Sequence, residues 1–128
     1  MSTEENKAIV RHLFEDGLNK RNVETMAECY PPGEHIEGLK FASRLFAAFP
    51  DYHIAIEDLI AEGDKVVVHW RAQGTHKGVW LGLAPTGKTF NIMGVDIEHL
   101  ANGKIIAEDG AYEEGVMLRQ LGVELPGD

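Results

Sequence analysis

Apolar residues in the first half of the chain recur every three to four positions, as on one face of an α-helix. Residues 2–22 open with a serine–glutamate capping box and keep this spacing. Residues 21–30 give a second, shorter stretch capped by Asn22, and residues 37–50 give a third that ends at a proline. The pattern predicts three helices in this half.

The second half alternates apolar and polar residues, which is typical of β-strands. Residues 52–76 predict two strands joined at an E-G-D turn, and residues 90–112 predict a hairpin that turns at Asn102-Gly103. Residues 77–88 form a glycine-rich loop between them, and residues 113–123 predict a short closing helix. Helices followed by strands favour an α+β fold, with the helices packed on one face of an antiparallel sheet.

Length and charge narrow the class of protein. A chain of 128 residues predicts a single domain, residues 1–128. Its 21 acidic and 12 basic side chains give a formal net charge of −9, which argues against a surface for nucleic acid or for acidic membranes. We see no membrane-spanning run, no signal-peptide pattern and a single cysteine that excludes an internal disulfide. We therefore expect a cytoplasmic protein.

Residues 82–89, GLAPTGKT, match the phosphate-binding P-loop pattern letter for letter. That pattern works between a strand and a helix, because the helix N-terminus holds the phosphate. Here a strand follows, so we interpret the match as a turn with Lys88 in solvent. The six histidines lack metal-binding spacing, and no pattern indicates a nucleophile, so we expect no metal site and no nucleophilic catalysis.

Asp96 stands in the middle of a predicted strand, where aspartate is uncommon. Alternation puts it on one face with Ile92 and Gly94, and the missing side chain of Gly94 leaves space for a ligand. The alternative is a structural carboxylate satisfied by hydrogen bonds. The other face carries a trio of apolar residues that predicts a homodimer interface: Met93, Val95 and Ile97.

The last predicted strand supplies a second carboxylate. Strict alternation groups Glu108 with Ile106, Gly110 and Tyr112 on one face and leaves Asp109 on the other. Either acid could instead be an ordinary exposed residue at the edge of the sheet.

Three runs of the sequence resemble the SnoaL-like polyketide cyclases, or ester cyclases, of the nuclear transport factor 2-like superfamily. They are ENKAIVRHLFEDGLNKRNVETMAE, GLKFASRLFAAFPDYHIAIEDLIAEGDKVVVHWRAQGTHKG and APTGKTFNIMGVDIEHLANGKIIAEDGAYEEGVMLRQLG. The resemblance implies a cone-shaped, cystatin-like antiparallel sheet that wraps around N-terminal helices and encloses a deep apolar pocket. It also implies an aldol cyclisation without cofactor or metal, and dimers or tetramers built on the outer face of the sheet.

The resemblance also suggests roles for single residues. The G-x-D-I strand is similar to that of ketosteroid isomerases, in which the matching aspartate faces the pocket and stabilises an oxyanion, so Asp96 is expected to point inward. Glu108 stands where relatives often carry histidine, and Gly110 where some carry the acidic catalyst. Relatives also form a short strand after the second helix that often supplies a pocket carboxylate, whereas AECYPPGEH passes directly into a loop here, where Glu34 and His35 could partly replace it.

We therefore expect an enzyme that performs acid–base chemistry on a small apolar carbonyl compound. Glu108 is the expected base, and a protonated Asp96 the expected oxyanion donor, because burial raises the pKa of a carboxyl group. The alternative is a non-catalytic binding or oligomerisation domain. Aromatic residues in the expected pocket could equally belong to the core. The residues expected to bind the substrate, with His76 orienting its carbonyl, are His35, Trp70, His76, Trp80, Phe90, Ile92, Gly94, Gly110 and Tyr112.

Overall fold

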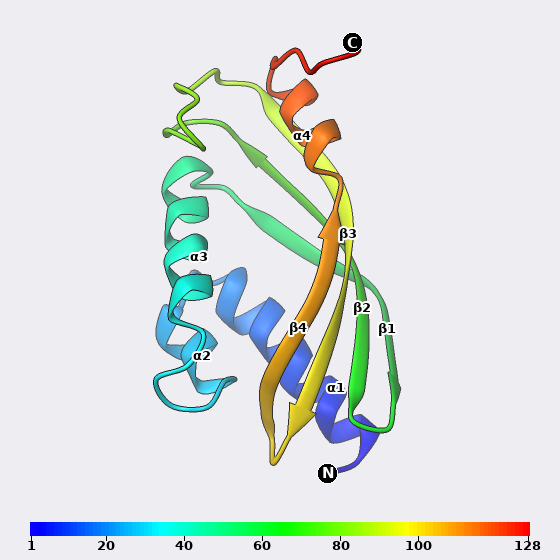
Figure 1. Cartoon of the computed structure of the whole chain (residues 1–128). Helices are drawn as coiled ribbons and strands as arrows, with labels where there is room; N and C mark the ends of the chain where they lie inside the picture. Colours follow the sequence, from blue (N-terminus) through cyan, green and yellow to red (C-terminus); the bar gives the residue numbers. More distant parts are fainter.

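A computed structural model describes residues 1–128 (Figure 1). The helical half contains four segments where the sequence predicted three, because a π-helix directly continues the first α-helix. The spacing of apolar residues is too coarse to separate such a wider turn from an α-helix. The segments are α1 (Thr3–His12), η1 (Leu13–Leu18), α2 (Val23–Glu28) and α3 (Ile36–Ala48).

The predicted capping box is present at the start of α1. The backbone N–H of Glu5 donates to Ser2 Oγ, and the backbone N–H of Ser2 donates to Glu5 Oε1, each at 3.1 Å. Two N–H groups that no helical carbonyl can reach are thereby satisfied, which fixes where α1 begins.

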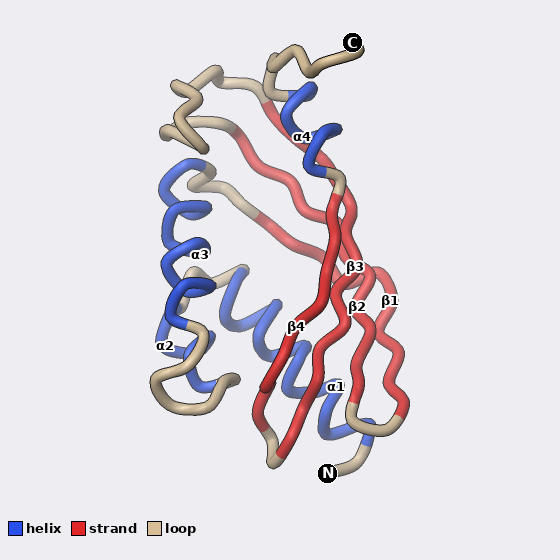
Figure 2. The backbone as a smooth tube through the Cα atoms, viewed as in Figure 1, coloured by secondary structure: helices blue, strands red, loops and turns tan.

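One four-stranded antiparallel sheet, in the order β1-β2-β3-β4, makes up the second half. It curves around α1, α2 and α3, which all lie on its concave side (Figures 1 and 2). The expected α+β fold, with a curved sheet around N-terminal helices, is confirmed. The elements are β1 (His53–Glu62), β2 (Lys65–Thr75), β3 (Thr89–Ala101), β4 (Lys104–Tyr112) and a closing helix, α4 (Glu114–Gln120).

Polar side chains fasten the end of η1 to the sheet. The amide of Asn19 donates to the carbonyl of Ile54 and accepts from its N–H, both at 2.8 Å. The guanidinium of Arg21 donates to the carbonyls of Pro50 and Tyr52 at 2.6 and 2.8 Å. These bonds hold the helices over the concave face of the sheet.

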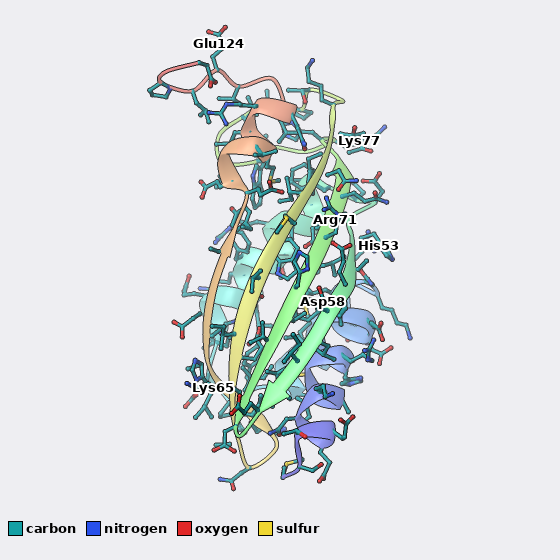
Figure 3. The ribbon with its side chains drawn as sticks, turned by 90° about the vertical axis from the view of Figure 1, so that its right-hand side faces the viewer. His53, Asp58, Lys65, Arg71, Lys77 and Glu124 are labelled. Carbon is teal, nitrogen blue, oxygen red and sulfur yellow. The ribbon has the colours of Figure 1, made fainter.

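The outer face of the sheet is exposed to solvent and more polar than the sequence suggested. Val95 is exposed there, and Met93 and Ile97 are partly so. Polar contacts lie on the same face: His69 Nδ1 is 2.9 Å from Asp58 Oδ2, and Arg71 forms an ion pair with Glu57. Figure 3 looks onto this face, with Asp58 and Arg71 labelled.

A β-bulge in β4 corrects the strict alternation expected for this strand. The turn at Asn102-Gly103, with positive φ at both residues, pairs Leu100 with Ile105, but the register then shifts and Glu98 pairs with Glu108. Ile105 is buried and Ile106 is exposed, so Ile106 does not share the face of Glu108. The extra residue turns Glu108 inward; an unbroken ladder would have turned Asp109 inward instead.

Residues 29–35 form no strand, as the sequence predicted. Their one sheet-like contact is a hydrogen bond of 2.7 Å from the N–H of Ile105 to the carbonyl of Cys29. The segment ends at His35, whose φ of 62° lies in the left-handed region and which precedes the first residue of α3. None of the helices is long and apolar enough to cross a membrane.

Candidate active site

A cavity of about 290 Å³ lies between the concave face of the sheet and the helices. Its lining is mostly apolar, and it receives side chains from η1, α2, α3, α4 and all strands. Both carboxylates singled out in the sequence are among the polar groups of this lining. Eight of the residues expected in the site line the cavity: His35, Trp70, Trp80, Phe90, Ile92, Asp96, Glu108 and Tyr112.

Two expected residues, Gly94 and Gly110, leave room for their neighbours instead of facing a ligand. A Cβ on Gly94 would overlap the indole ring of Trp70, which lies across that position. A Cβ on Gly110 would lie 2.5 Å from Asp96 Oδ1, on the neighbouring strand. The space beside Asp96 is therefore filled by Trp70, and Gly110 makes room for the carboxylate.

His76 does not reach the cavity. It is completely buried, and its Nδ1 accepts a hydrogen bond of 3.2 Å from the backbone N–H of Thr86 and lies 3.0 Å from the Thr86 hydroxyl. The ring holds the loop between β2 and β3 together. It therefore cannot orient a substrate carbonyl as the sequence suggested.

The same loop contains the P-loop look-alike, which lies before a strand as the sequence predicted. The stretch runs into β3 and no helix follows it. The N–H of Gly87 donates to the carbonyl of His76 at 2.9 Å, so it is not free to bind phosphate. Lys88 is exposed.

Asp96 is the carboxylate with the clearest electrostatic signature in the cavity. It pairs with Gly110 in the β3–β4 ladder, and Glu108 lies two residues before Gly110 on β4. Burial raises the pKa of Asp96 to about 6, and the neighbouring Glu108 carboxylate adds to the rise. The indole N–H of Trp70 opposes it, although it makes no hydrogen bond of ordinary geometry.

Glu108 belongs to a small polar group at the side of the cavity. His35 Nε2 lies 3.2 Å from Glu108 Oε1, and the His35 ring stacks on Tyr30, with 4.0 Å between centroids and 8° between planes. Burial, followed by the Glu108 charge, raises the pKa of Tyr30, so its hydroxyl keeps its proton. His35 thus bridges the loop after α2 and the last strand.

Sequence reasoning missed Glu98, Tyr30 and Tyr52. Glu98 is completely buried, and burial, with Glu108 as the next cause, strongly raises its pKa. Its spacing of two residues from Asp96 was a usable signal, because alternation puts both side chains on one face. Tyr52 lines the cavity, and burial raises its pKa, with the Asp96 charge as a second cause. The tyrosines had no comparable signal.

Carboxylate oxygens of Asp96, Glu98 and Glu108 lie within 4.8 Å of one another. Such a group can share protons or offer oxygen ligands to a hard cation. Combined with the protonated tyrosines and the histidine, it can accept a proton from a substrate and donate hydrogen bonds to a developing negative charge.

Comparison with known proteins identifies relatives of the chain. The family model described as SnoaL-like polyketide cyclase matches residues 8–121. No curated protein matches the sequence. Among solved structures, AclR from Streptomyces galilaeus, a proposed hydroxylase, superposes with a TM-score of 0.87 at 21% identity, covering 98% of this chain and 87% of AclR.

Two further structures are similar in fold and slightly closer in sequence. IdmH from Streptomyces antibioticus, a proposed polyketide cyclase, has a TM-score of 0.78 at 26% identity, covering 92% of this chain and 99% of IdmH. A proposed SnoaL-like polyketide cyclase from Jannaschia sp. CCS1 has a TM-score of 0.83 at 25% identity, covering 95% of each chain.

Proposed function

Because the chain belongs to the SnoaL-like polyketide cyclase family, we propose that it is a cyclase-type enzyme acting on a small apolar carbonyl compound, with Asp96 as the acid–base group. The observation that supports this most is the position of the Asp96 carboxyl in a mostly apolar cavity, with a pKa of about 6. A base of that pKa is ionised at neutral pH yet still basic enough to accept a proton.

The proposed reaction is an intramolecular aldol closure. The Asp96 carboxylate takes a proton from the carbon next to a carbonyl and leaves an enolate. The enolate carbon attacks a second carbonyl of the same molecule, a C–C bond forms, and the alkoxide takes the proton back from Asp96. Substrate and product are isomers, so atoms and electrons balance without a cofactor or co-reactant.

Asp96 takes the role of base that the sequence suggested for Glu108. A permanently protonated oxyanion donor needs a pKa well above neutrality, whereas that of Asp96 is about 6. We therefore assign the base to Asp96. Tyr52, protonated and in the lining, and His35, held at Glu108, are the proposed hydrogen-bond donors to the enolate oxygen.

Non-catalytic binding of an apolar molecule is the second candidate. Of the 21 lining residues, 17 are hydrophobic, so the cavity could retain such a molecule without any reaction. The two candidates differ in one respect: only the enzyme exchanges a substrate proton with water.

Exchange of the α-protons of 2-tetralone in D2O, followed by proton NMR, tests this difference. This small apolar ketone enolises without any second reaction, so it reports proton abstraction alone. Binding is measured separately by tryptophan fluorescence, because both tryptophans of the chain, Trp70 and Trp80, line the cavity.

We expect the wild-type protein to accelerate exchange and Asp96→Asn to lose about 10²–10⁴-fold of that rate while still binding the ketone. Asp109→Asn, an acid-to-amide change at an exposed position of β4, is the matched control and should keep the rate. Binding of 2-tetralone by the wild type without exchange would favour the binding protein over the enzyme.

We further propose a cytoplasmic homodimer, formed through the apolar part of the outer sheet face around Val95. Val95, which is exposed on the open sheet between the partly exposed Met93 and Ile97, supports this interface.

A further inference from the structure

Glu98 occupies an unusual position for an acidic residue. It lies on β3, on the same face as Asp96, and is directly opposite Glu108 on β4. No part of it is exposed, and neither carboxyl oxygen has a hydrogen-bond donor from the protein. It is also not among the residues that line the cavity.

The titratable groups around Glu98 cannot neutralise a negative charge on it. Asp96 comes from its own strand, Glu108 from β4, and Tyr30, which stays protonated, from the loop after α2. The one basic side chain paired with this cluster, His35, is bound to Glu108. A completely buried carboxylate without a partner is strongly unfavourable, so a proton or a cation must compensate it.

A proton fits the position better than a cation. A hard divalent cation takes six or more oxygen ligands and usually keeps bound water. Glu98 is completely buried and lies outside the cavity lining, and the three carboxylates, with one ligand atom each, offer fewer oxygens than such a cation takes. A proton needs only one acceptor, and the carboxyl group that faces Glu98 is that of Glu108.

We propose that Glu98 is a neutral carboxylic acid whose O–H donates to the Glu108 carboxylate, so that the two strands are joined by an acid–carboxylate pair. Two carboxyl oxygens attract each other only when one carries a proton, and such O–H···O⁻ bonds are short and strong. Burial, which favours the neutral form of Glu98, supports this assignment.

The pair makes Glu98 a positioning residue. The Glu108 carboxylate accepts the hydrogen bond from Glu98 and also contacts His35. These two contacts fix the Glu108 carboxylate and, through it, His35, which faces the cavity. This functional consequence rests on the proposed acid–base function, whereas the location of the proton does not.

The proton can be located in the protein without substrate. In the carbon NMR spectrum of protein labelled at the glutamate side-chain carboxyl carbon, one resonance should have the chemical shift of a protonated carboxyl group from pH 6 to 8. That resonance should vanish in Glu98→Gln and in Glu98→Leu, so either folded variant suffices for the assignment. A carboxylate shift for Glu98 across this range would overturn the proposal.

Stability provides an independent measurement. The folded state keeps a proton that the unfolded state has lost, so stability falls as pH rises above the ordinary glutamic acid pKa. Between pH 7 and 8.5 Asp96 is ionised in both states, so the unfolding constant of the wild type should rise about tenfold per pH unit relative to Glu98→Gln. If the ratio of the two unfolding constants stays constant between pH 7 and 8.5, the proposal is contradicted. It is also contradicted if calorimetry shows that the wild type binds Mg²⁺ or Mn²⁺ and that Glu98→Gln does not.

The positioning role is tested with 2-tetralone exchange. Glu98→Leu leaves Glu108 without its donor and should lower kcat by about 10²-fold, whereas Glu98→Gln supplies an amide N–H and should restore most of the rate. Equal rates in both variants would contradict positioning. If the wild type exchanges no protons, the proposed function fails, but the NMR and stability results still decide whether the pair exists.

Discussion

Replacing Asp96 with asparagine should make the protein more stable at neutral pH, by an amount that grows with pH. The folded state binds a proton at Asp96 up to a pKa of about 6, whereas the unfolded chain loses it at the ordinary value of 3.8. The unfolded state therefore ionises first, and the wild type loses stability as pH rises from about 4 to 6. Asparagine cannot ionise, so the variant lacks this loss.

The difference of about 2.2 pKa units corresponds to about 3 kcal/mol at full effect, since one unit is worth about 1.36 kcal/mol. At pH 4.5 the wild type has already lost about 1 kcal/mol of stability relative to Asp96→Asn. It should lose about 2 kcal/mol more between pH 4.5 and 7.5. The change with pH is the informative quantity, because any difference in packing between the two side chains adds a constant.

Urea unfolding of the wild type and of Asp96→Asn at pH 4.5, 5.5, 6.5 and 7.5 measures this change. Asp109→Asn is the control, since its exposed pair with His99 contributes less than about 1 kcal/mol. If the difference between wild type and Asp96→Asn stays constant from pH 4.5 to 7.5, the Asp96 carboxyl is not desolvated and the reasoning is wrong.

Three further predictions concern the framework of the fold, the loop and the assembly. Asn19→Ala should lower the free energy of unfolding by about 2 kcal/mol in urea titrations, because both polar backbone groups of Ile54 lose their partner; a loss under 0.5 kcal/mol would contradict the role of this link. Lys88→Ala should leave the melting temperature unchanged, and calorimetry should detect no ATP binding to the wild type; binding that the variant abolishes would restore the P-loop interpretation. Light scattering should give a dimer for the wild type and a monomer for Val95→Glu, and a monomeric wild type at high concentration would exclude the interface.

The parts of the fold with a strong local signal were predictable from the sequence. The dipeptide Asn102-Gly103 tolerates positive φ at both positions, so the last hairpin could be placed to the residue. The alternation of β3 likewise grouped Asp96 with Ile92 and Gly94 on one face, although the family resemblance was needed to predict that this face points inward. Both signals depend on neighbouring residues alone.

The details that escaped prediction depend on contacts between distant residues. No local pattern marks the bulge that turns Glu108 inward, because its effect appears only when β4 is laid against β3. The loop contact of His76 with Thr86 and the overlap of Trp70 with Gly94 likewise involve residues ten or more positions apart. Site residues of this kind require the three-dimensional structure.

The pH dependence of 2-tetralone exchange is the measurement that tests the proposed chemistry most directly. If Asp96 is the base, kcat/KM of the wild type should rise with pH, level off above an apparent pKa near 6, and lose this dependence together with its magnitude in Asp96→Asn. A wild-type profile without a change near pH 6, or one that Asp96→Asn retains, would contradict the assignment of Asp96 as the proton-transferring group.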